Sequence, residues 1–224
     1  MLDIGAGSGR LTAPLARTGA EVWAIELDAR LAHTLGARFA SAGNVHVVEG
    51  DASRVPLPRR AFRVVANLPF GSTTAILRRL LDDPSVPLVR ADVIVEWGVA
   101  RKRAACWPST LLGVTWGAWY ELTVVRRLPA GCFEPKPSVD AALLRATRRV
   151  RSLVADREAA RFRAFVRSAF ADGLPRSRAA RRCLAELGLD RGATPRDLDV
   201  HQWAALFTYH LPPAPRVRRG APRA

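Results

Sequence analysis

The sequence Met1-Leu2-Asp3-Ile4-Gly5-Ala6-Gly7-Ser8-Gly9 decides the fold, because it joins the end of an apolar strand to a run of alternating glycines. A helical pattern follows over residues 10–18. Glycine lets the backbone turn sharply and come close to a ligand, and a helix start beside such a turn favours polar or anionic groups. The spacing is GxGxG rather than the GxGxxG of most dinucleotide-binding folds. We therefore expect a nucleotide-like ligand at Gly5, Gly7 and Gly9.

Acidic side chains follow the next two predicted strands. Residues 21–25 form an apolar strand that ends at Glu26, and residues 45–48 form another that leads to Asp51 and Ala52. A carboxylate at the end of the second strand can accept hydrogen bonds from both ribose hydroxyls. Asp51 can accept from an adenine amine, while the neighbouring backbone N–H donates to the ring. Either acid alone could be a solvated loop residue, but their succession indicates a nucleotide pocket.

The tetrapeptide Asn67-Leu68-Pro69-Phe70 ends a further apolar run, residues 62–66. The oxygen of Asn67 and nearby backbone carbonyls can accept hydrogen bonds from a planar amine, and the Phe70 ring can stack on a planar base. Proline holds the turn in one shape. Asn and Pro are also common in ordinary turns, so the position of the tetrapeptide after three acidic or glycine-rich strand ends carries the inference. We expect it to hold a base with an exocyclic amine, such as adenine.

Alternating strands and helices predict an α/β fold with right-handed crossovers and a mainly parallel sheet. The last two strands, joined by a hairpin-like loop, are expected to be antiparallel. Beyond about residue 148 the pattern is helical, with an aromatic stripe that favours core packing. Ser72 or Thr73 is expected to cap the helix that follows the tetrapeptide. The expected helices are residues 29–40, 73–81, 99–105, 156–171, 175–187 and 195–209, and the remaining strands are residues 91–97, 120–128 and 139–147.

These patterns predict three segments: a ligand-binding domain over residues 1–147, a helical lobe over 148–211 and a disordered basic tail over 212–224. The net charge is +15, and residues 148–224 hold 17 arginines against 7 acidic residues. A basic lobe favours a polyanionic partner, because neutralised phosphates release counterions. A solvated charged face is the alternative. The arginines expected to contact phosphates cluster at one predicted helix start: Arg176, Arg178, Arg181 and Arg182.

Other classes of function find little support in the composition. No apolar run approaches 18 residues, so no membrane span is expected. Three scattered cysteines without a CxxC pair, and four histidines without metal spacing, predict neither a disulfide framework nor a metal site. A reducing cytoplasm is the expected location.

Five motifs in order resemble the rRNA adenine N6-dimethyltransferase family, whose members use S-adenosylmethionine. They are Gly5-Ala6-Gly7-Ser8-Gly9, Ile25-Glu26-Leu27-Asp28, Gly50-Asp51-Ala52, Asn67-Leu68-Pro69-Phe70 and Phe133-Glu134-Pro135-Lys136-Pro137-Ser138-Val139-Asp140. Residues 90–104 and 194–203 are more similar to the erythromycin-resistance (Erm) branch, in its actinobacterial form. The resemblance covers nearly the whole chain. It implies a class I, Rossmann-like S-adenosylmethionine-dependent methyltransferase domain with a small C-terminal helical domain.

The resemblance also implies roles for individual residues. Gly5, Gly7 and Gly9 would border the methionine part of the cofactor, Glu26 would hold its ribose, and Asp51 and Ala52 would bind its adenine. Asn67, Leu68 and Phe70 would hold the target base, with Asn67 also beside the cofactor, and Phe133 would lie beside the flipped adenosine. Holding the amine with oxygen acceptors would localise its lone pair, so positioning rather than a strong general base would carry the rate.

The sequence departs from the family at two places. Members usually carry a segment with a Gln-Asn-Phe-Leu-type motif before the first strand, and this sequence opens inside that strand. A late start or a fragment is therefore expected, and weak cofactor binding with it. The second departure is Glu96-Trp97-Gly98, where the family usually has Glu at the third position.

The expected function is methylation, mono or di, of an adenine N6 in the macrolide-binding region of 23S rRNA, giving macrolide-lincosamide-streptogramin resistance. The expected partner is naked or partly assembled 23S rRNA, and the expected state is a monomer. A small-subunit (16S) rRNA dimethylase is the close alternative, and a DNA adenine methyltransferase is a weaker one. A truncated, non-catalytic RNA-binding factor is the alternative from another class. An NAD oxidoreductase is disfavoured, because nothing after the third strand supplies a hydride-transfer site.

Overall fold

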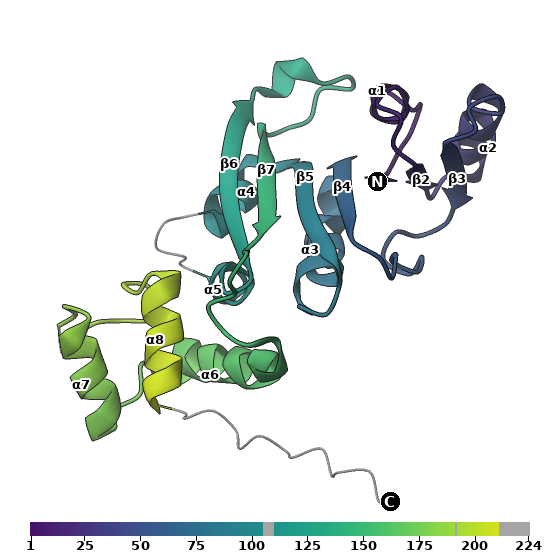
Figure 1. Ribbon diagram of the computed structural model, residues 1–224. Coiled ribbons are helices and arrows are strands. Elements are labelled where there is room, and N and C mark those ends of the chain that lie inside the picture. Colours follow the sequence, from purple (N-terminus) through teal and green to yellow (C-terminus); the bar gives the residue numbers. More distant parts are fainter. Residues whose placement is uncertain (105–109, 191, 211–224) are drawn as a thin grey trace, which may run out of the picture.

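A seven-stranded sheet forms the centre of the computed structural model, which describes residues 1–104, 110–190 and 192–210. The strand order is β3-β2-β1-β4-β5-β7-β6 (Figure 1). The first five strands are parallel, and β7 is antiparallel to both of its neighbours. The strands are β1 (Leu2–Ile4), β2 (Val22–Glu26), β3 (Val45–Glu49), β4 (Phe62–Asn67), β5 (Leu88–Glu96), β6 (Tyr120–Leu128) and β7 (Ala141–Arg148).

The central strands are apolar because they are covered on both faces, as is usual for parallel sheets. Leu2 and Ile4 of β1, Val64 of β4 and Val93 of β5 are all buried. The predicted α/β fold, mainly parallel sheet and antiparallel closing pair are confirmed. The insertion of β7 between β5 and β6 was not predicted, because hydrophobic alternation identifies a strand but not its neighbours.

The helices that flank the sheet follow the predicted segments with shifted ends. They are α1 (Thr12–Ala16), α2 (Ala29–Arg38), α3 (Thr73–Leu81) and α4 (Trp97–Arg103). The predicted bounds of α3 are confirmed, but its predicted side-chain cap is wrong. The short 3-10 turn η1 (Phe70–Ser72) runs into the helix, so Ser72 makes no cap hydrogen bond and the Thr73 hydroxyl donates to the Pro69 carbonyl. A further helix, α5 (Leu111–Gly117), was not predicted.

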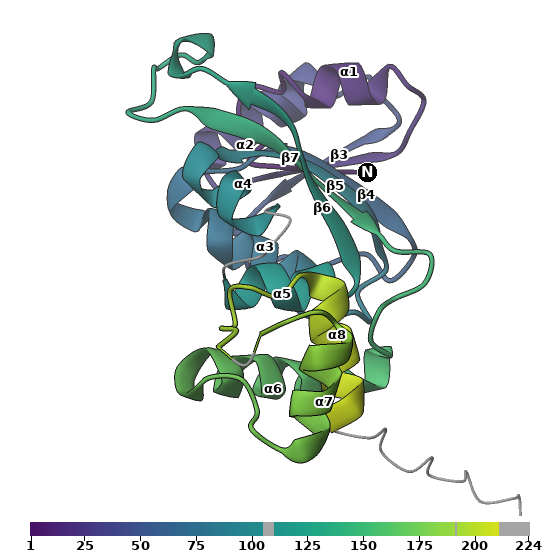
Figure 2. The ribbon, with the colours of Figure 1, turned by 90° about the vertical axis from the view of Figure 1, so that its left-hand side faces the viewer.

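Beyond Arg148 the described residues form helices joined by loops, and α6, α7 and α8 gather at one end of the sheet (Figure 2). These helices are α6 (Ala159–Asp172), α7 (Arg178–Glu186) and α8 (Val200–His210). The aromatic stripe packs in the core as expected: Phe162 meets Trp119 and Phe207 in edge-to-face geometry. Cys106 and the predicted disordered tail, residues 212–224, lie outside the described residues.

Polar contacts join the helical lobe to the loop between α3 and β5. Arg148 donates to the carbonyls of Pro84 and Val86, and Arg163 of α6 donates to the Asp82 carbonyl. The same loop also contacts α5, because the Trp116 indole N–H donates to Oδ1 of Asp82 at 2.6 Å. One continuous hydrophobic cluster also runs from the sheet into the helices. The lobe therefore packs directly on the sheet domain.

Candidate ligand-binding site at the carboxyl edge of the sheet

The glycine loop after β1 folds over the end of β2. Gly5, Gly7 and Gly9 have φ values of +70°, +54° and +80°, in the left-handed region that favours glycine. The N–H groups of Gly5 and Ala6 both donate to the carbonyl of Ile25, at 2.8 and 3.1 Å. The loop is thereby held at the carboxyl edge of the sheet, where ligands bind in open α/β folds.

The carboxylate of Glu26 fixes this loop from the next strand. Its Oε2 accepts from the Gly7 N–H at 2.7 Å, and its Oε1 accepts from the N–H groups of Leu27 and Asp28 at 2.9 and 3.0 Å. A carboxylate has about four acceptor sites, and three are already used. Glu26 can therefore accept one further hydroxyl in this arrangement, whereas the two predicted ribose contacts require one of the three N–H groups to move away.

A buried acid beneath the glycine loop was missed by the sequence reasoning. Asp3 is 1% exposed; its Oδ2 accepts from the Thr12 hydroxyl at 2.6 Å, while its Oδ1 has no partner within the described residues. Burial raises the pKa of Asp3 to about 6, against the opposing effect of the Thr12 hydrogen bond. An acid inside an apolar strand, directly before the glycines, was the available signal. An unpartnered buried oxygen is suited to a polar or cationic ligand group.

The glycine loop and the predicted base-binding turn lie side by side. A Cβ on Gly5 would stand 3.5 Å from Cδ of Pro69 and 3.6 Å from the carbonyl oxygen of Asn67. A Cβ on Gly7 would meet only the Gly5 carbonyl, at 4.0 Å, so space remains above this residue. Gly9 differs, because a Cβ there would clash with Leu35 and Phe39. Gly9 therefore packs against Leu35 of α2 and against Phe39, which directly follows α2.

The predicted base-binding turn offers an exposed amide. Asn67 ends β4 with its side chain exposed and without a hydrogen-bond partner in the described part of the chain. Leu68 is buried, and its N–H donates to the Ile94 carbonyl at 3.1 Å. Only the backbone of Leu68 is therefore available to a ligand. Phe70 is half-buried in η1.

Asp51 follows the end of β3. Because β2 lies between β3 and β1, Asp51 and the glycine loop are on opposite sides of Glu26, the last residue of β2. Its Oδ1 accepts from the Ser53 N–H at 2.7 Å. Hydrogen bonding to the side chain and backbone of Ser53 lowers the pKa of the Asp51 carboxyl, which is therefore ionised at neutral pH. Ala52 is half-buried against the core. The strand register pairs Glu26 with Glu49, and the Gly50 N–H donates to the backbone carbonyl of Glu26 at 2.8 Å. The Asp51 loop therefore begins beside the end of β2.

Phe133 lies in the loop between β6 and β7. It follows the 3-10 turn η2 (Ala130–Cys132) and is half-buried. Ala141 pairs with both Glu96 and Leu128, so this loop leaves the sheet beside the carboxyl end of β5. Phe133 is thus carried by a loop at the same edge as Asn67.

The four predicted phosphate-contacting arginines lie away from this edge. All are exposed around the start of α7, where Ser177 caps the helix. Arg182 forms an ion pair with Glu186 at 2.8 Å, so its charge is partly used. Figures 1 and 2 place α7 at the opposite end of the molecule from α1. These arginines could contact a distant part of a long ligand, but they lie too far away to contact a group bound at Asn67.

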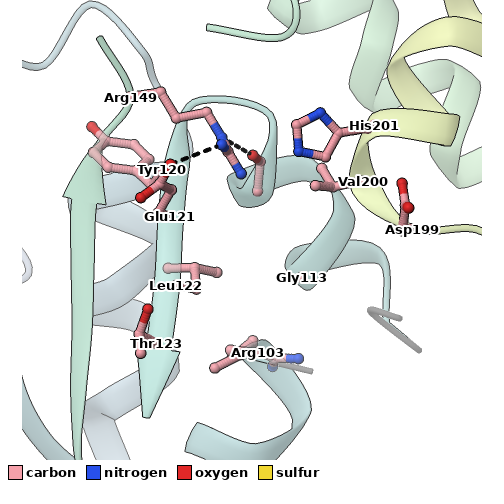
Figure 3. Close-up of a pocket in the computed structure, with 12 residues that line it drawn as sticks. Arg103, Gly113, Tyr120, Glu121, Leu122, Thr123, Arg149, Asp199, Val200 and His201 are labelled. Carbon is pink, nitrogen blue, oxygen red and sulfur yellow. Dashed lines mark hydrogen bonds and ion pairs between the residues drawn. The ribbon is translucent and has the colours of Figure 1, made fainter. Parts of the chain in front are cut away.

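A cavity of about 380 Å³ lies between α4, α5, β6 and the start of α8 (Figure 3). Arg149 crosses it, with Nε donating to the Gly117 carbonyl at 2.9 Å and an ion pair to Glu121 at 3.2 Å. Arg103 lines the other side, over the Trp116 ring, and burial lowers its pKa. None of the predicted site residues lines this cavity, which sits at the amino-terminal half of β6.

Within residues 1–104, 110–190 and 192–210, no group of three or more His, Cys, Asp or Glu side chains is placed to bind a metal ion. No helix in the same ranges has the length and apolar character needed to cross a membrane.

Comparison with known proteins identifies relatives along nearly the whole chain. The family model "Ribosomal RNA adenine dimethylase" matches residues 1–174. The mycinamicin-resistance protein MyrB of Micromonospora griseorubida is 36% identical over 217 residues, which are 92% of this chain and 68% of MyrB. Ribosomal RNA small subunit methyltransferase A of a Synechococcus strain is 32% identical, over 97% of this chain and 83% of that protein. The crystal structure of the 23S rRNA methyltransferase ErmE superposes with a TM-score of 0.80 at 29% identity, covering 93% of this chain and 89% of ErmE.

Proposed function

The chain belongs to the ribosomal RNA adenine dimethylase family of S-adenosylmethionine-dependent adenine N6-methyltransferases, and we propose that it methylates an adenine in the macrolide-binding region of 23S rRNA. Such methylation would give resistance to macrolides, lincosamides and streptogramins. The observation that carries the proposal is the contact between the glycine loop and the Asn67 turn. It brings a cofactor pocket and a base-holding turn to one point.

The residues at the carboxyl edge fit the cofactor. S-Adenosylmethionine supplies an electrophilic methyl group on its sulfonium. Asp51 and Ala52 would hold its adenine, and Glu26 would accept from a ribose hydroxyl. Asp3 and the space above Gly7 suit its methionine part, because the buried Oδ1 of Asp3 lacks a partner among the described residues and can accept from an ammonium group.

The Asn67 turn would hold the target amine. The exposed Asn67 amide oxygen and the Leu68 carbonyl can each accept one of its N–H groups, which localises the nitrogen lone pair. Phe70 and Phe133 can stack on a base that has left its helix, as base-modifying enzymes require. After methyl transfer the nitrogen would carry a positive charge, which makes it acidic enough to lose a proton to water. Orientation of the amine, rather than a general base, then carries the rate.

The choice of 23S rRNA rests on similarity in two segments. Residues 90–104 and 194–203 resemble Erm proteins, and the names of MyrB and ErmE associate those proteins with mycinamicin resistance and with 23S rRNA. The Synechococcus relative gives weight to the alternative, a small-subunit rRNA methyltransferase. Methylation of purified 23S and 16S transcripts, with mapping of the modified adenine, distinguishes the two.

The physical state of the substrate follows from the same reasoning. A base must leave its helix to reach the Asn67 turn, so we propose naked or partly assembled 23S rRNA as the partner. The exposed arginines at the start of α7 would contact its phosphates at a distance from the reaction centre. We place the reaction in the cytoplasm, carried out by a monomer. Gel filtration with light scattering tests the monomer, and a dimer would contradict it.

A further inference from the structure

The loop between β6 and β7 is attached to the sheet close to the Asn67 turn. Ala141 at its far end pairs with Glu96, while Asn67 pairs with Ile94 on the same strand β5. Neighbouring strands are about 4.8 Å apart, so β7 stands about 10 Å from β4. In Figures 1 and 2 the loop projects at the end of the sheet occupied by α1. It is therefore within reach of a base held at Asn67.

Asp140 closes the base of this loop through both carboxylate oxygens. Its Oδ1 accepts from the Ala130 N–H at 3.0 Å, and its Oδ2 accepts from Nε and a terminal nitrogen of Arg127 at 3.0 and 2.7 Å. Its backbone carbonyl accepts from the Trp97 N–H at 2.9 Å. The Arg127 guanidinium lies 5.0 Å from the centroid of the Trp97 ring. We call these four residues the Asp140 anchor.

The anchor connects to Phe133 by a short chain of hydrogen bonds. Asp140 accepts from the Ala130 N–H, and the Ala130 carbonyl in turn accepts from the Phe133 N–H at 3.2 Å. The Cys132 N–H donates to the Pro129 carbonyl at 2.9 Å, which completes the η2 turn. Restraining Ala130 therefore restrains the backbone of Phe133.

The charge of Asp140 suits this role. Hydrogen bonds from the Ala130 backbone and then from Arg127 lower the pKa of the Asp140 carboxyl, which is therefore an anion at neutral pH. Hydrogen bonds to an ionised acceptor are stronger than neutral ones. The side chains of Asp140 and Arg127 are 30% and 58% exposed, so their ion pair adds little to global stability. Its main effect is on the geometry of the loop.

We propose that Asp140 is a positioning residue for methyl transfer, which acts by holding the loop so that Phe133 stays beside the target adenine. This inference rests on the proposed function. Asp140 touches neither cofactor nor base; it acts through Ala130 and Arg127. A misplacement of a reacting group by about 1 Å can cost about 100-fold in rate. A loop that is tied to the sheet at one carboxylate is sensitive to the loss of that tie.

Steady-state kinetics with the variants D140A, D140N, R127A and F133A provide the first test. We expect D140A to lower kcat by roughly 10–100-fold, with an unchanged dissociation constant for S-adenosylmethionine and an unchanged unfolding midpoint. D140N keeps one oxygen acceptor, so it should lose less than D140A. R126A is the matched control, because Arg126 is the exposed neighbour of Arg127 on β6 and makes no ion pair within the described residues. R126A should leave kcat unchanged and should at most weaken RNA binding.

The double variant D140A/F133A separates positioning from an independent role. If Asp140 acts through Phe133, the double variant should turn over no more slowly than F133A alone. In the control double variant R126A/F133A, the fold-losses of the two single variants should instead multiply, because Arg126 does not act through Phe133. Multiplied losses in D140A/F133A, or a normal kcat in D140A or F133A, would overturn the proposal.

Amide hydrogen exchange gives a second readout that does not depend on activity. In D140A without cofactor or RNA, the Ala130 and Phe133 amides should exchange at least about tenfold faster, because their local opening costs less free energy. The amides of β6 should keep their protection. Unchanged exchange at Ala130 and Phe133 would overturn the anchor. Absence of wild-type methylation on both 23S and 16S transcripts would contradict the proposed function instead, and the exchange rates would then decide the anchor by themselves.

Discussion

The hydroxyl of Thr12 donates a 2.6 Å hydrogen bond to Oδ2 of Asp3, and both side chains are buried beneath the glycine loop. The second oxygen of Asp3 has no partner among the described residues. A buried carboxylate with one empty acceptor is costly to the fold on its own. The buried carboxylate of Asp3 is explained if it binds a ligand rather than stabilises the fold.

The first prediction concerns D3N, which should stabilise the cofactor-free protein at pH 7.5. The pKa of Asp3 is about 6 in the folded chain, above its ordinary value of 3.8. A raised pKa favours the protonated form, so this stabilisation is complete at low pH and is lost as the pH rises through about 6. Above that pH the wild type carries a buried charge, and D3N should gain roughly 1–3 kcal/mol in the free energy of unfolding. Near pH 4 the two proteins should be alike.

Urea denaturation across pH 4 to 7.5 measures this difference. D190N is a control, because Asp190 is exposed. The same D3N variant should bind S-adenosylmethionine more weakly than wild type at pH 7.5. Equal stability of D3N and wild type at pH 7.5 would contradict the burial argument, and unchanged or tighter cofactor binding by D3N would contradict the ligand role.

The second prediction concerns Glu26, which both fixes the glycine loop and has one acceptor site left. E26A should weaken S-adenosylmethionine binding by roughly 1–3 kcal/mol, the range expected when buried hydrogen-bond partners are left unpaired. E49A is the matched control, because Glu49 is the exposed register partner of Glu26 on β3. Isothermal calorimetry should show a loss for E26A alone. Equal affinities for both variants would refute the assignment.

The third prediction concerns the base-holding turn. N67A and F70A should leave folding intact, because Asn67 is exposed and Phe70 is half-buried. Both should lower methyl transfer to rRNA by about 100-fold or more, since the amine loses its orientation. S72A lies in the same turn and makes no cap hydrogen bond, so it should retain activity. Near wild-type turnover by N67A or F70A, measured by tritiated methyl incorporation, would remove the turn from the mechanism.

The fourth prediction concerns the basic start of α7. Changing Arg178 and Arg181 to Gln should weaken binding of matched and mismatched RNA hairpins alike and flatten the salt dependence by about one unit for each lost phosphate contact. R182Q should have a smaller effect, because Arg182 is paired with Glu186. Filter-binding titrations at several salt concentrations measure these slopes. An unchanged slope in the double variant would favour a solvated charged face.

Some features could be predicted from the sequence because they depend on local signals. The alternation in Tyr120–Leu128, stopped by Pro129, predicted the bounds of β6 correctly. The acidic residues at the end of β2 and after β3 lie on adjacent parallel strands, as expected, and their binding of a ligand stays a prediction. Other features depend on tertiary packing. The single acid Asp3 inside an apolar strand has no periodic signal, and the clash that requires Gly9 comes from Leu35 and Phe39, distant in sequence.

The most direct test of the central claim is to incubate the protein with tritiated S-adenosylmethionine and separate 23S and 16S rRNA transcripts, and then to map the modified base. The account predicts label on N6 of an adenine in the macrolide-binding region of the 23S transcript, and lower label, by about 100-fold or more, after incubation with N67A. Label confined to the 16S transcript, or equal label with wild type and N67A, would contradict it.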